Sequence, residues 1–313
     1  MAEIRVGLIG GTGLAQALGA EDGRRHEVST PFGAPSDAII ETQWAGATVL
    51  LLSRHGPGHC LPPSRVPFRA NIFALKELGC THIIASGAVG SLREEIRPRD
   101  LVICDQAIDR TWGRQASFYE RAAVHVEMAE PFCPVLREVL IEAARALAQD
   151  GAGEAPPARF TVHERGCYVC MEGPAFSTRA ESLMHRLWGG DLVGMTAMPE
   201  AKLAREAEIP YALVALVTDY DCWRPSAPAD QQGAPQKPSA TELLKEIMGN
   251  LEAASANAVR LVKKAVEMIA ARGDSLPQSP AQRALELAIW SDKAAIDPEE
   301  VQRLSPLWIK YFG

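Results

Sequence analysis

The sequence lacks the features that direct a chain to a membrane or to nucleic acid. No apolar run approaches the roughly 20 residues that a membrane-spanning helix needs. The first residues, MAEIRVGLI, do not show the basic and then apolar segments of a signal peptide. No basic run stands out, and the formal net charge is −7. We therefore expect a cytoplasmic protein that binds neither nucleic acid nor an anionic membrane.

Motifs for nucleotide cofactors and metals are missing as well. There is no GxxxxGK[ST] motif, so a bound phosphate would be a free co-substrate and not part of ATP. Gly10, Gly11 and Gly13 are not followed by the glycine at position 16 that the dinucleotide fingerprint requires, which argues against an oxidoreductase. Cys167 and Cys170 have CxxC spacing, but no second pair and no histidine at zinc spacing accompanies them. The seven cysteines suit buried thiols in a reducing compartment, and we expect no metal and no organic cofactor.

What is present is an alternation of strand-like and helix-like segments. Strands are expected at residues 4–9, 48–53, 81–85, 100–104, 166–171, 192–195 and 211–217. Helices are expected at residues 67–78, 135–148, 177–188, 199–208 and 241–271. This pattern predicts an α/β fold, with a single domain over residues 1–272 and a central, mixed, mostly buried β-sheet flanked by helices. Residues 224–239, rich in Pro, Ala and Gln, are expected to form a loop.

A short helical C-terminal extension is expected over residues 273–313. After a polar break, a helix is predicted at 281–289, and a second one opens at Asp297 as N-cap with Pro298 in its first turn. The extension also carries a cluster of apolar residues: Trp290, Leu307, Trp308, Ile309, Tyr311 and Phe312. Because a free tail would not normally keep such a cluster, we expect the extension to dock on the core or on a neighbouring subunit.

The most informative motif is Asp219-Tyr220-Asp221, directly after the apolar run at 211–217. In open α/β sheets, ligands bind at the carboxyl ends of strands. Side chains alternate along a strand, so both carboxylates would face the same way. Such a pair suits a heterocycle that offers one ring nitrogen to be protonated and one exocyclic amine to be accepted, as adenine does. The alternative is a helix cap with an exposed neighbour.

Other predicted strand ends carry small polar or basic residues, and a single-layer sheet would bring them to one crevice. Arg54 can bind a phosphate through two parallel N–H bonds, and His55 adds a donor. Thr12 and Thr196 add hydroxyl groups. The alternatives are a surface salt bridge for the basic pair, and a turn or cap for each hydroxyl.

The order and spacing of these motifs resemble those of the 5′-methylthioadenosine phosphorylases, in the trimeric purine nucleoside phosphorylase family. The resemblance covers residues 4–270. It is carried by GLIGGTGL at 7–14, TPFGAPS at 30–36, SRHG at 53–56, NIFALKE at 71–77, GSLREE at 90–95, DRT at 109–111, MAEPFCP at 128–134, EGPAFS at 172–177, GMT at 194–196, PE at 199–200 and DYDCW at 219–223.

The resemblance implies the nucleoside phosphorylase fold, a homotrimer, and phosphorolysis of 5′-methylthioadenosine to adenine and 5-methylthioribose 1-phosphate. Asp219 would donate or share a proton at purine N7, and Asp221 would accept the 6-amino group. Relatives acting on 6-oxopurines have an asparagine at the first position, so Asp219 favours adenine. The positions that match phosphate-binding residues of the family are Thr12, Arg54, His55, the backbone of Ala88, and Thr196.

The resemblance also assigns the rest of the substrate site. Phe176 matches the residue that packs on the base, and Met195 the one under the ribose. His125 matches a residue near the sugar 5′ position that is contributed across a subunit boundary. Positions aligned with an apolar pocket for the 5′ group are Ala240, Leu243 and Leu244. The alternative for these three is a helix that simply packs on the core.

One departure from the family pattern concerns phosphate and ribose. Ser86 and Gly87 stand where close family members have two threonines, one of which contacts both groups, and Gly87 has no hydroxyl to offer. Ala197 replaces a second threonine after Thr196. Two alternatives therefore stay open: a phosphorylase for adenosine, 5′-deoxyadenosine or methylthioinosine, and a non-catalytic homologue that kept the fold.

Overall fold

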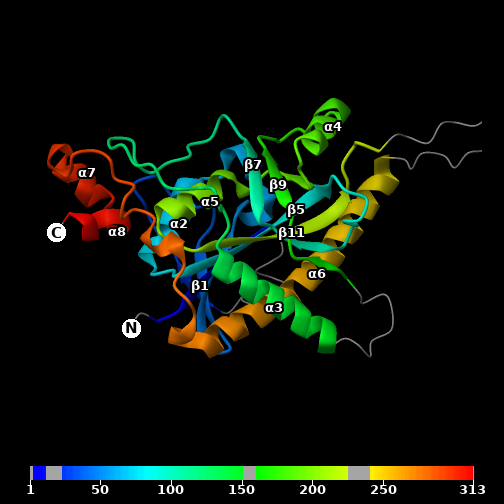
Figure 1. Cartoon of the computed structure of the whole chain (residues 1–313), viewed down its shortest axis with the longest axis horizontal. Helices are drawn as coiled ribbons and strands as arrows, with labels where there is room; N and C mark the ends of the chain where they lie inside the picture. The colour runs from blue at the N-terminus through cyan, green and yellow to red at the C-terminus, as the bar shows by residue number, and fades with distance from the viewer. Residues whose placement is uncertain (1–2, 12–22, 151–159, 225–239, 313) are drawn as a thin grey trace, which may run out of the picture.

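The computed structural model describes residues 3–11, 23–150, 160–224 and 240–312. Its centre is a mixed β-sheet flanked by helices, as the sequence pattern predicts (Figure 1). The strands are β1 (Arg5–Gly10), β2 (Arg24–His26), β3 (Ile39–Trp44), β4 (Ala47–Ser53), β5 (His82–Ser91), β6 (Leu101–Ile103), β7 (Gln106–Arg110), β8 (Val162–His163), β9 (Cys167–Met171), β10 (Leu192–Gly194) and β11 (Tyr211–Tyr220).

The sheet follows the order β2-β3-β4-β1-β5-β10-β9-β7, and β11 branches from β5 to pair with β6, which in turn pairs with β8. Strands β1, β4, β5 and β11 run parallel to one another, whereas β10 pairs with β5 in the antiparallel sense. β5 is therefore the junction of the sheet. Its first half is paired with β1, its end is paired with β10, and β11 runs along its whole length.

The helices cover both faces of this sheet. They are α2 (Phe68–Glu77), α3 (Pro134–Asp150), α4 (Arg179–Leu187), α5 (Ala197–Glu206), α6 (Ala240–Arg272), α7 (Pro298–Arg303) and α8 (Ser305–Trp308). Short 3-10 turns lie at Pro57–His59, Pro63–Arg65, Gly273–Ser275, Pro280–Arg283, Lys293–Ala295 and Ile309–Tyr311. No helix in the described ranges is long and apolar enough to cross a membrane.

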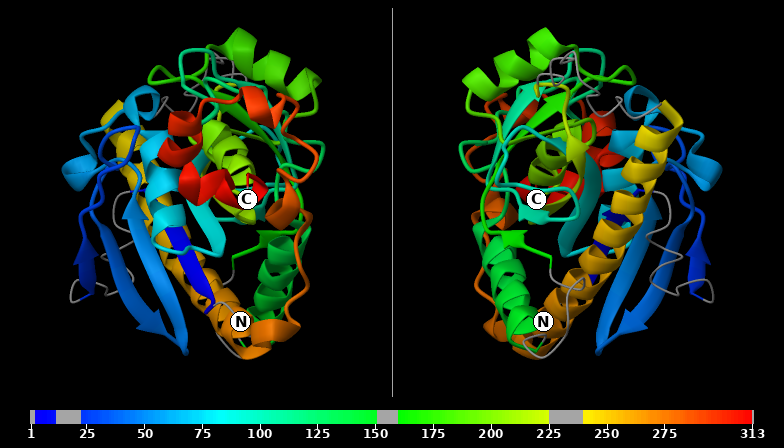
Figure 2. Two further views of the ribbon diagram at one scale, coloured as in Figure 1. Left: turned by 90° about the vertical axis from the view of Figure 1, so that its left-hand side faces the viewer. Right: turned by 90° about the vertical axis from the view of Figure 1, so that its right-hand side faces the viewer.

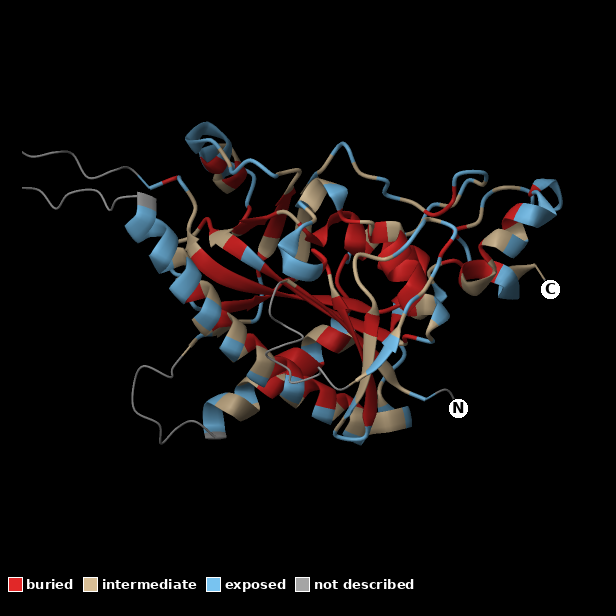
Figure 3. Ribbon diagram, turned by 180° about the vertical axis from the view of Figure 1, so that it is seen from behind, coloured by how far each residue is buried: buried red, intermediate tan, exposed pale blue. Residues whose placement is uncertain are grey.

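Strand β11 shows how the two-residue period of a strand builds two apolar cores. One core contains α3 and α6, and the other contains α2, α5 and the C-terminal extension. Figure 3 shows that burial is concentrated in the sheet between these helices. The residues of β11 alternate between the two cores: Ala212, Val214 and Leu216 face the first, and Leu213, Ala215 and Val217 face the second.

The C-terminal extension folds back on its own chain (Figure 2). Leu307 and Trp308 are buried in the same core as α2, and the Trp308 ring lies 4.7 Å from that of Tyr119. Trp290 and Ile309 stay exposed. Leu307 and Trp308 of the extension thus pack on the body of their own chain.

The helix expected at 281–289 is wrong apart from its first turn. Only Pro280–Arg283 is helical, as a 3-10 turn opened by Ser279. Beyond it, the Leu285 amide donates to the Glu208 carboxylate at 3.1 Å, and Ile289 forms a β-bridge with Val124. These long-range partners replace the bonds that a helix would have made within itself. The sequence also missed β2, β3, β7 and β8. The expected loop at 224–239 falls almost entirely outside the described residues.

Candidate functional site

The candidate site lies along an open edge of β5. On that edge, pairing with β1 ends at Ala85, and pairing with β10 begins at Gly90. Among the described strands, none pairs with this edge over residues 86–89. Such a gap, where neighbouring strands diverge, is where α/β sheets bind ligands. The other edge of β5 is fixed by β11, which sets Val214 opposite Ser86 and Asp219 opposite Gly90.

Arg54 reaches this gap from the end of β4. Its backbone N–H donates to the Gly10 carbonyl at 2.9 Å, which holds it beside the end of β1. Arg54 as a whole is 0 % exposed, and its guanidinium donates through Nε and Nη2 to Glu200, both at 2.8 Å. Its Nη1 donates to the Ser86 carbonyl, also at 2.8 Å. The pair of parallel N–H bonds expected for phosphate is thus directed at a carboxylate, and two of the five N–H groups remain.

His55 follows Arg54 and is mostly buried. Burial, together with the charge of Arg54, lowers the pKa of its imidazole to about 4. Its Nδ1 lies 2.8 Å from the Leu61 carbonyl, and a carbonyl only accepts, so Nδ1 carries the proton. In the neutral ring, Nε2 is then an acceptor. His55 would therefore meet a phosphate hydroxyl as acceptor, where the sequence suggested a donor.

Thr196 stands at the N-terminal end of α5 with a buried hydroxyl that has no hydrogen-bond partner among the described residues. It faces Gly87, since a Cβ placed on Gly87 would lie 2.9 Å from Thr196 Oγ1. The Thr196 amide lies 3.3 Å from the Tyr168 hydroxyl, which fixes the start of the helix. An unpaired buried hydroxyl is a group that a ligand can satisfy.

The two aspartates mark the other end of the gap. Burial raises the pKa of the Asp219 carboxyl, and the nearby Asp221 carboxylate raises it further. The hydrogen bond that Asp219 accepts from the Thr218 hydroxyl, at 2.6 Å, lowers this pKa and so opposes the shift. Asp221 Oδ2 is buried and has no partner in the described chain. Asp221 sits close against Gly90, because a Cβ on that glycine would lie only 3.2 Å from Asp221 Cβ. The pair thus offers a carboxyl with a raised pKa, on Asp219, and an acceptor oxygen without a donor in the described chain, on Asp221.

The remaining predicted substrate residues do not converge in the single chain. Phe176 is 86 % exposed, and Leu243 and Leu244 are exposed on the first turns of α6. The exposed His125 packs its ring 4.5 Å from that of Trp290. Ala88 is exposed on β5, and Met195 is half-buried. Thr12 lies outside the described residues, as does the side chain of Ala240.

Sequence reasoning missed several groups that support the site. Glu200 and Tyr211 surround Arg54, and nothing in their local sequence signals a contact with a residue so distant in the chain. Arg114 donates from Nη1 to the carbonyls of Met195 and Met198, at 2.7 and 2.6 Å, and so fixes the backbone around Thr196. His185, on α4, has a buried Nδ1 without a partner in the described chain. Burial lowers the pKa of its imidazole, and the charge of Asp221 opposes this shift.

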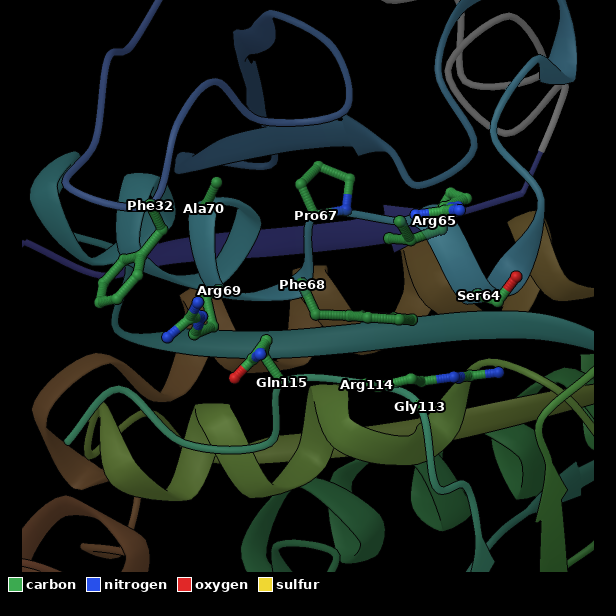
Figure 4. A pocket seen from close by; sticks show the side chains of 11 residues that line it. Phe32, Ser64, Arg65, Pro67, Phe68, Arg69, Ala70, Gly113, Arg114 and Gln115 are labelled. Atoms are coloured by element: carbon green, nitrogen blue, oxygen red, sulfur yellow. The ribbon is translucent and has the colours of Figure 1, made fainter. Parts of the chain in front are cut away.

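A cavity of about 240 Å³ lies elsewhere, beside the start of α2 (Figure 4). It contains none of the predicted site residues. Its lining consists of Phe32, Ser64, Arg65, Val66, Pro67, Phe68, Arg69, Ala70, Gly113, Arg114 and Gln115.

Possible metal ligands do not cluster in the described part of the chain. No group of three or more His, Cys, Asp or Glu residues there could hold a metal ion. All seven cysteines are free, and Cys60 and Cys222 are exposed, against the expectation of buried thiols. Burial raises the pKa of Cys167 to about 11 and that of Cys170 to about 12, which disfavours the reactive thiolates.

Comparisons with known proteins agree with this geometry. A family model described as "Phosphorylase superfamily" matches residues 5–267. An S-methyl-5′-thioadenosine phosphorylase from Synechocystis sp. is 42 % identical over 313 residues, covering 100 % of this chain and 89 % of the relative. The same name belongs to a Cereibacter sphaeroides protein that is 51 % identical over 221 residues, 70 % of this chain and 72 % of the relative. The Synechocystis match includes the C-terminal extension.

Solved structures give the same picture. A methylthioadenosine phosphorylase from an Antarctic soil metagenomic library superposes with a TM-score of 0.83 at 43 % identity, covering 98 % of this chain and 99 % of that one. The methylthioadenosine phosphorylase of Schistosoma mansoni, in complex with adenine, gives a TM-score of 0.78 at 35 % identity, with 92 % and 99 % covered.

Proposed function

The chain belongs to the phosphorylase superfamily, and we propose that it cleaves 5′-methylthioadenosine with inorganic phosphate to give adenine and 5-methylthioribose 1-phosphate. One observation carries the proposal. Two buried oxygens, Thr196 Oγ1 and Asp221 Oδ2, have no partner in the described chain, and the residues that carry them lie against Gly87 and Gly90 of the same strand. An unpaired hydroxyl and an unpaired carboxylate beside the open stretch of β5 suit the two ends of a purine nucleoside poised for attack by an anion.

In the proposed reaction, a phosphate oxygen forms a bond to C1′ of the ribose as the bond from C1′ to purine N9 breaks. The bonding pair passes into the purine, and a proton from Asp219 reaches N7, so that neutral adenine leaves. The raised pKa of Asp219 is the direction that a proton donor needs. Asp221 accepts a hydrogen bond from the 6-amino group and so favours adenine over 6-oxopurines.

At the anionic end, phosphate would be bound by the two remaining N–H groups of Arg54, by Thr196, and by the backbone of Ala88 on the open edge of β5. Neutral His55 would accept a hydrogen bond from a phosphate hydroxyl, and Thr12 would add a donor. Preorganised donors around the attacking anion and a proton for the leaving base stabilise both ends of the transition state. The chemistry requires no metal and no organic cofactor.

The binding sites for the sugar and the base would be completed by residues that do not converge in the single chain, most of which are exposed there. Phe176 would pack on adenine, and Met195 would lie under the ribose. Ala240, Leu243 and Leu244 would contact the methylthio group. His125 would reach the site of a second subunit in a homotrimer, and its exposure supports such a role. We place the protein in the cytoplasm, in salvage of purines and methionine.

The test is adenine release from methylthioadenosine with and without phosphate, next to adenosine, 5′-deoxyadenosine and methylthioinosine. Adenosine belongs in the set because a relative is named adenosine/methylthioadenosine phosphorylase. Phosphate-dependent release that is fastest from methylthioadenosine is the expected result. Release that ignores phosphate would identify a hydrolase. No turnover of any substrate would favour the non-catalytic homologue and implicate Gly87.

A further inference from the structure

Arg54 is fixed by its neighbours before any anion arrives. Three of its N–H groups are engaged at 2.8 Å, two by Glu200 and one by the Ser86 carbonyl. Both ionised side chains are almost wholly excluded from solvent, at 1 % and 0 % exposed. Bidentate pairing fixes the plane of a guanidinium as well as its position. The direction of the two remaining N–H groups is therefore set by Glu200.

Glu200 is fixed in turn by Tyr211. The Tyr211 hydroxyl donates to Glu200 Oε1 at 2.8 Å, and Tyr211 is 2 % exposed. Burial and the Glu200 charge raise the pKa of this phenol well above its usual value, so it remains a donor at all working pH values. Tyr211 is the first residue of β11, the strand that ends at Asp219, and Glu200 lies on α5, the helix that begins after Thr196. The network thus joins the elements that carry both ends of the proposed site.

We propose that Glu200 and Tyr211 are positioning residues that orient the Arg54 guanidinium towards phosphate. The Glu200 carboxylate also neutralises the charge of Arg54, so that the anion is held by oriented N–H groups and not by a free cation. This inference rests on the proposed function. The Arg54–Glu200 pair is neutral as a unit, which removes most of the penalty of burying either ion alone. Its benefit to phosphate therefore depends on orientation, and orientation depends on the Tyr211 hydroxyl.

Tyr211→Phe is the sharpest test because it removes one hydroxyl and leaves the ion pair and the packing in place. We expect the phosphate KM to rise about fivefold to tenfold, on the scale of one buried hydrogen bond, while the nucleoside KM stays within about twofold. The matched control is Tyr119→Phe. Tyr119 is also buried, and its hydroxyl donates to the Glu206 carbonyl at 3.2 Å, outside the Arg54 network. This control should leave both KM values unchanged.

Two Glu200 variants separate orientation from charge. Glu200→Asp keeps the charge but loses reach, and Glu200→Gln keeps the reach but loses the charge. Both should raise the phosphate KM if the carboxylate aims Arg54. If Glu200→Asp left the phosphate KM unchanged and Glu200→Gln lowered it by freeing the charge of Arg54, charge alone would matter and the positioning role would be rejected. Should these variants fail to fold, Tyr211→Phe still decides.

The outcomes distinguish this inference from the proposed function. An unchanged phosphate KM in Tyr211→Phe, in an enzyme that turns over methylthioadenosine, overturns the positioning role alone. Equal rises in both KM values would indicate a structural defect and also overturn it. If the wild-type protein shows no phosphate-dependent turnover, the proposed function fails. Inorganic phosphate can then still be titrated against melting temperature, where a smaller shift for Tyr211→Phe than for Tyr119→Phe is expected, and equal shifts reject the role.

Discussion

Gly87 and Thr196 are in such close approach that a Cβ at position 87 would lie 2.9 Å from Thr196 Oγ1. The two residues come from different elements, β5 and the start of α5. The threonine hydroxyl therefore occupies space that a side chain at 87 would fill. In this chain, the absence of a side chain at 87 is thus linked to the present position of the hydroxyl at 196.

We predict that Gly87→Ala raises the phosphate KM about tenfold, because the new methyl group displaces the Thr196 hydroxyl. Steady-state kinetics at varied phosphate measures this. Gly249→Ala is a suitable control, since Gly249 lies in α6 with nothing near its Cβ position, and alanine there should stabilise the helix by roughly 1 kcal/mol. In a Thr196→Ala background, Gly87→Ala should add little, and a full additive effect would contradict the displacement.

Asp219→Asn should lower kcat for methylthioadenosine by about 100-fold or more, the range expected for loss of a general acid. The same change should favour methylthioinosine relative to methylthioadenosine, because an amide can donate to a 6-oxopurine. In the wild type, the rate should fall as pH rises through the elevated pKa of Asp219. A pH–rate profile that kept this limb in the asparagine variant would assign the proton to another group.

His82 should make the protein sensitive to acid. It is buried at the start of β5, and burial lowers its pKa from 6.5 to about 4. Between these values the unfolded chain binds the proton and the native state does not, so stability falls as pH falls from about 6.5 towards 4. The effect at pH 5 relative to pH 7 is on the order of 2 kcal/mol. Urea denaturation at both pH values should show a smaller difference for His82→Asn, and an undiminished one would exclude His82 as a source.

Glu208 should tie the C-terminal extension to the body of the protein. Its buried carboxylate accepts hydrogen bonds from the Leu285 amide and, at 2.6 Å, from the Tyr311 hydroxyl, and it lies 2.6 Å from Lys310 Nζ. Asparagine tolerates the positive φ of this residue but is too short to reach these partners. Glu208→Asn should therefore lower stability by about 2 kcal/mol and speed protease cleavage within residues 273–280.

The control for this prediction is Lys310→Ala, which removes the exposed partner of the carboxylate, leaves its bonds to Leu285 and Tyr311 in place, and should cost less stability than Glu208→Asn. Truncation after Arg272 tests the same docking more severely, since it uncovers the core that Trp308 closes. A truncated protein with unchanged stability and assembly would show that the extension contributes nothing to the fold.

Local patterns were enough to predict the main helices and the buried strands. The period of apolar residues located α2, α3 and α6 within a few residues, because each buries one continuous stripe. The helix expected at 177–188 begins instead at Arg179, since Thr178 and Glu181 form a capping box. The short strands β2, β7 and β8 escaped because their stability comes from neighbours and not from their own composition.

The site was predictable in its residue types but not in its internal partners. The Asp219–Asp221 pair and Arg54 are visible as polar groups after apolar runs. That Arg54 directs its N–H pair at Glu200 is not visible, because the two residues are 146 positions apart and meet only through the tertiary fold. The acceptor role of His55 likewise follows from one contact with the Leu61 carbonyl.

The branched pairing of β5 has a consequence for how this protein could diversify. β5 is hydrogen-bonded to β1 near its start, to β10 at its end and to β11 along one side. A change in its length or curvature would therefore disrupt its pairing with all three strands. The separation between the two glycines at 87 and 90 would thus be inherited unchanged by any descendant that keeps the sheet. New substrate preferences would have to be acquired at the periphery, through exposed side chains such as Phe176, Leu243 and Leu244, where replacement leaves the sheet intact.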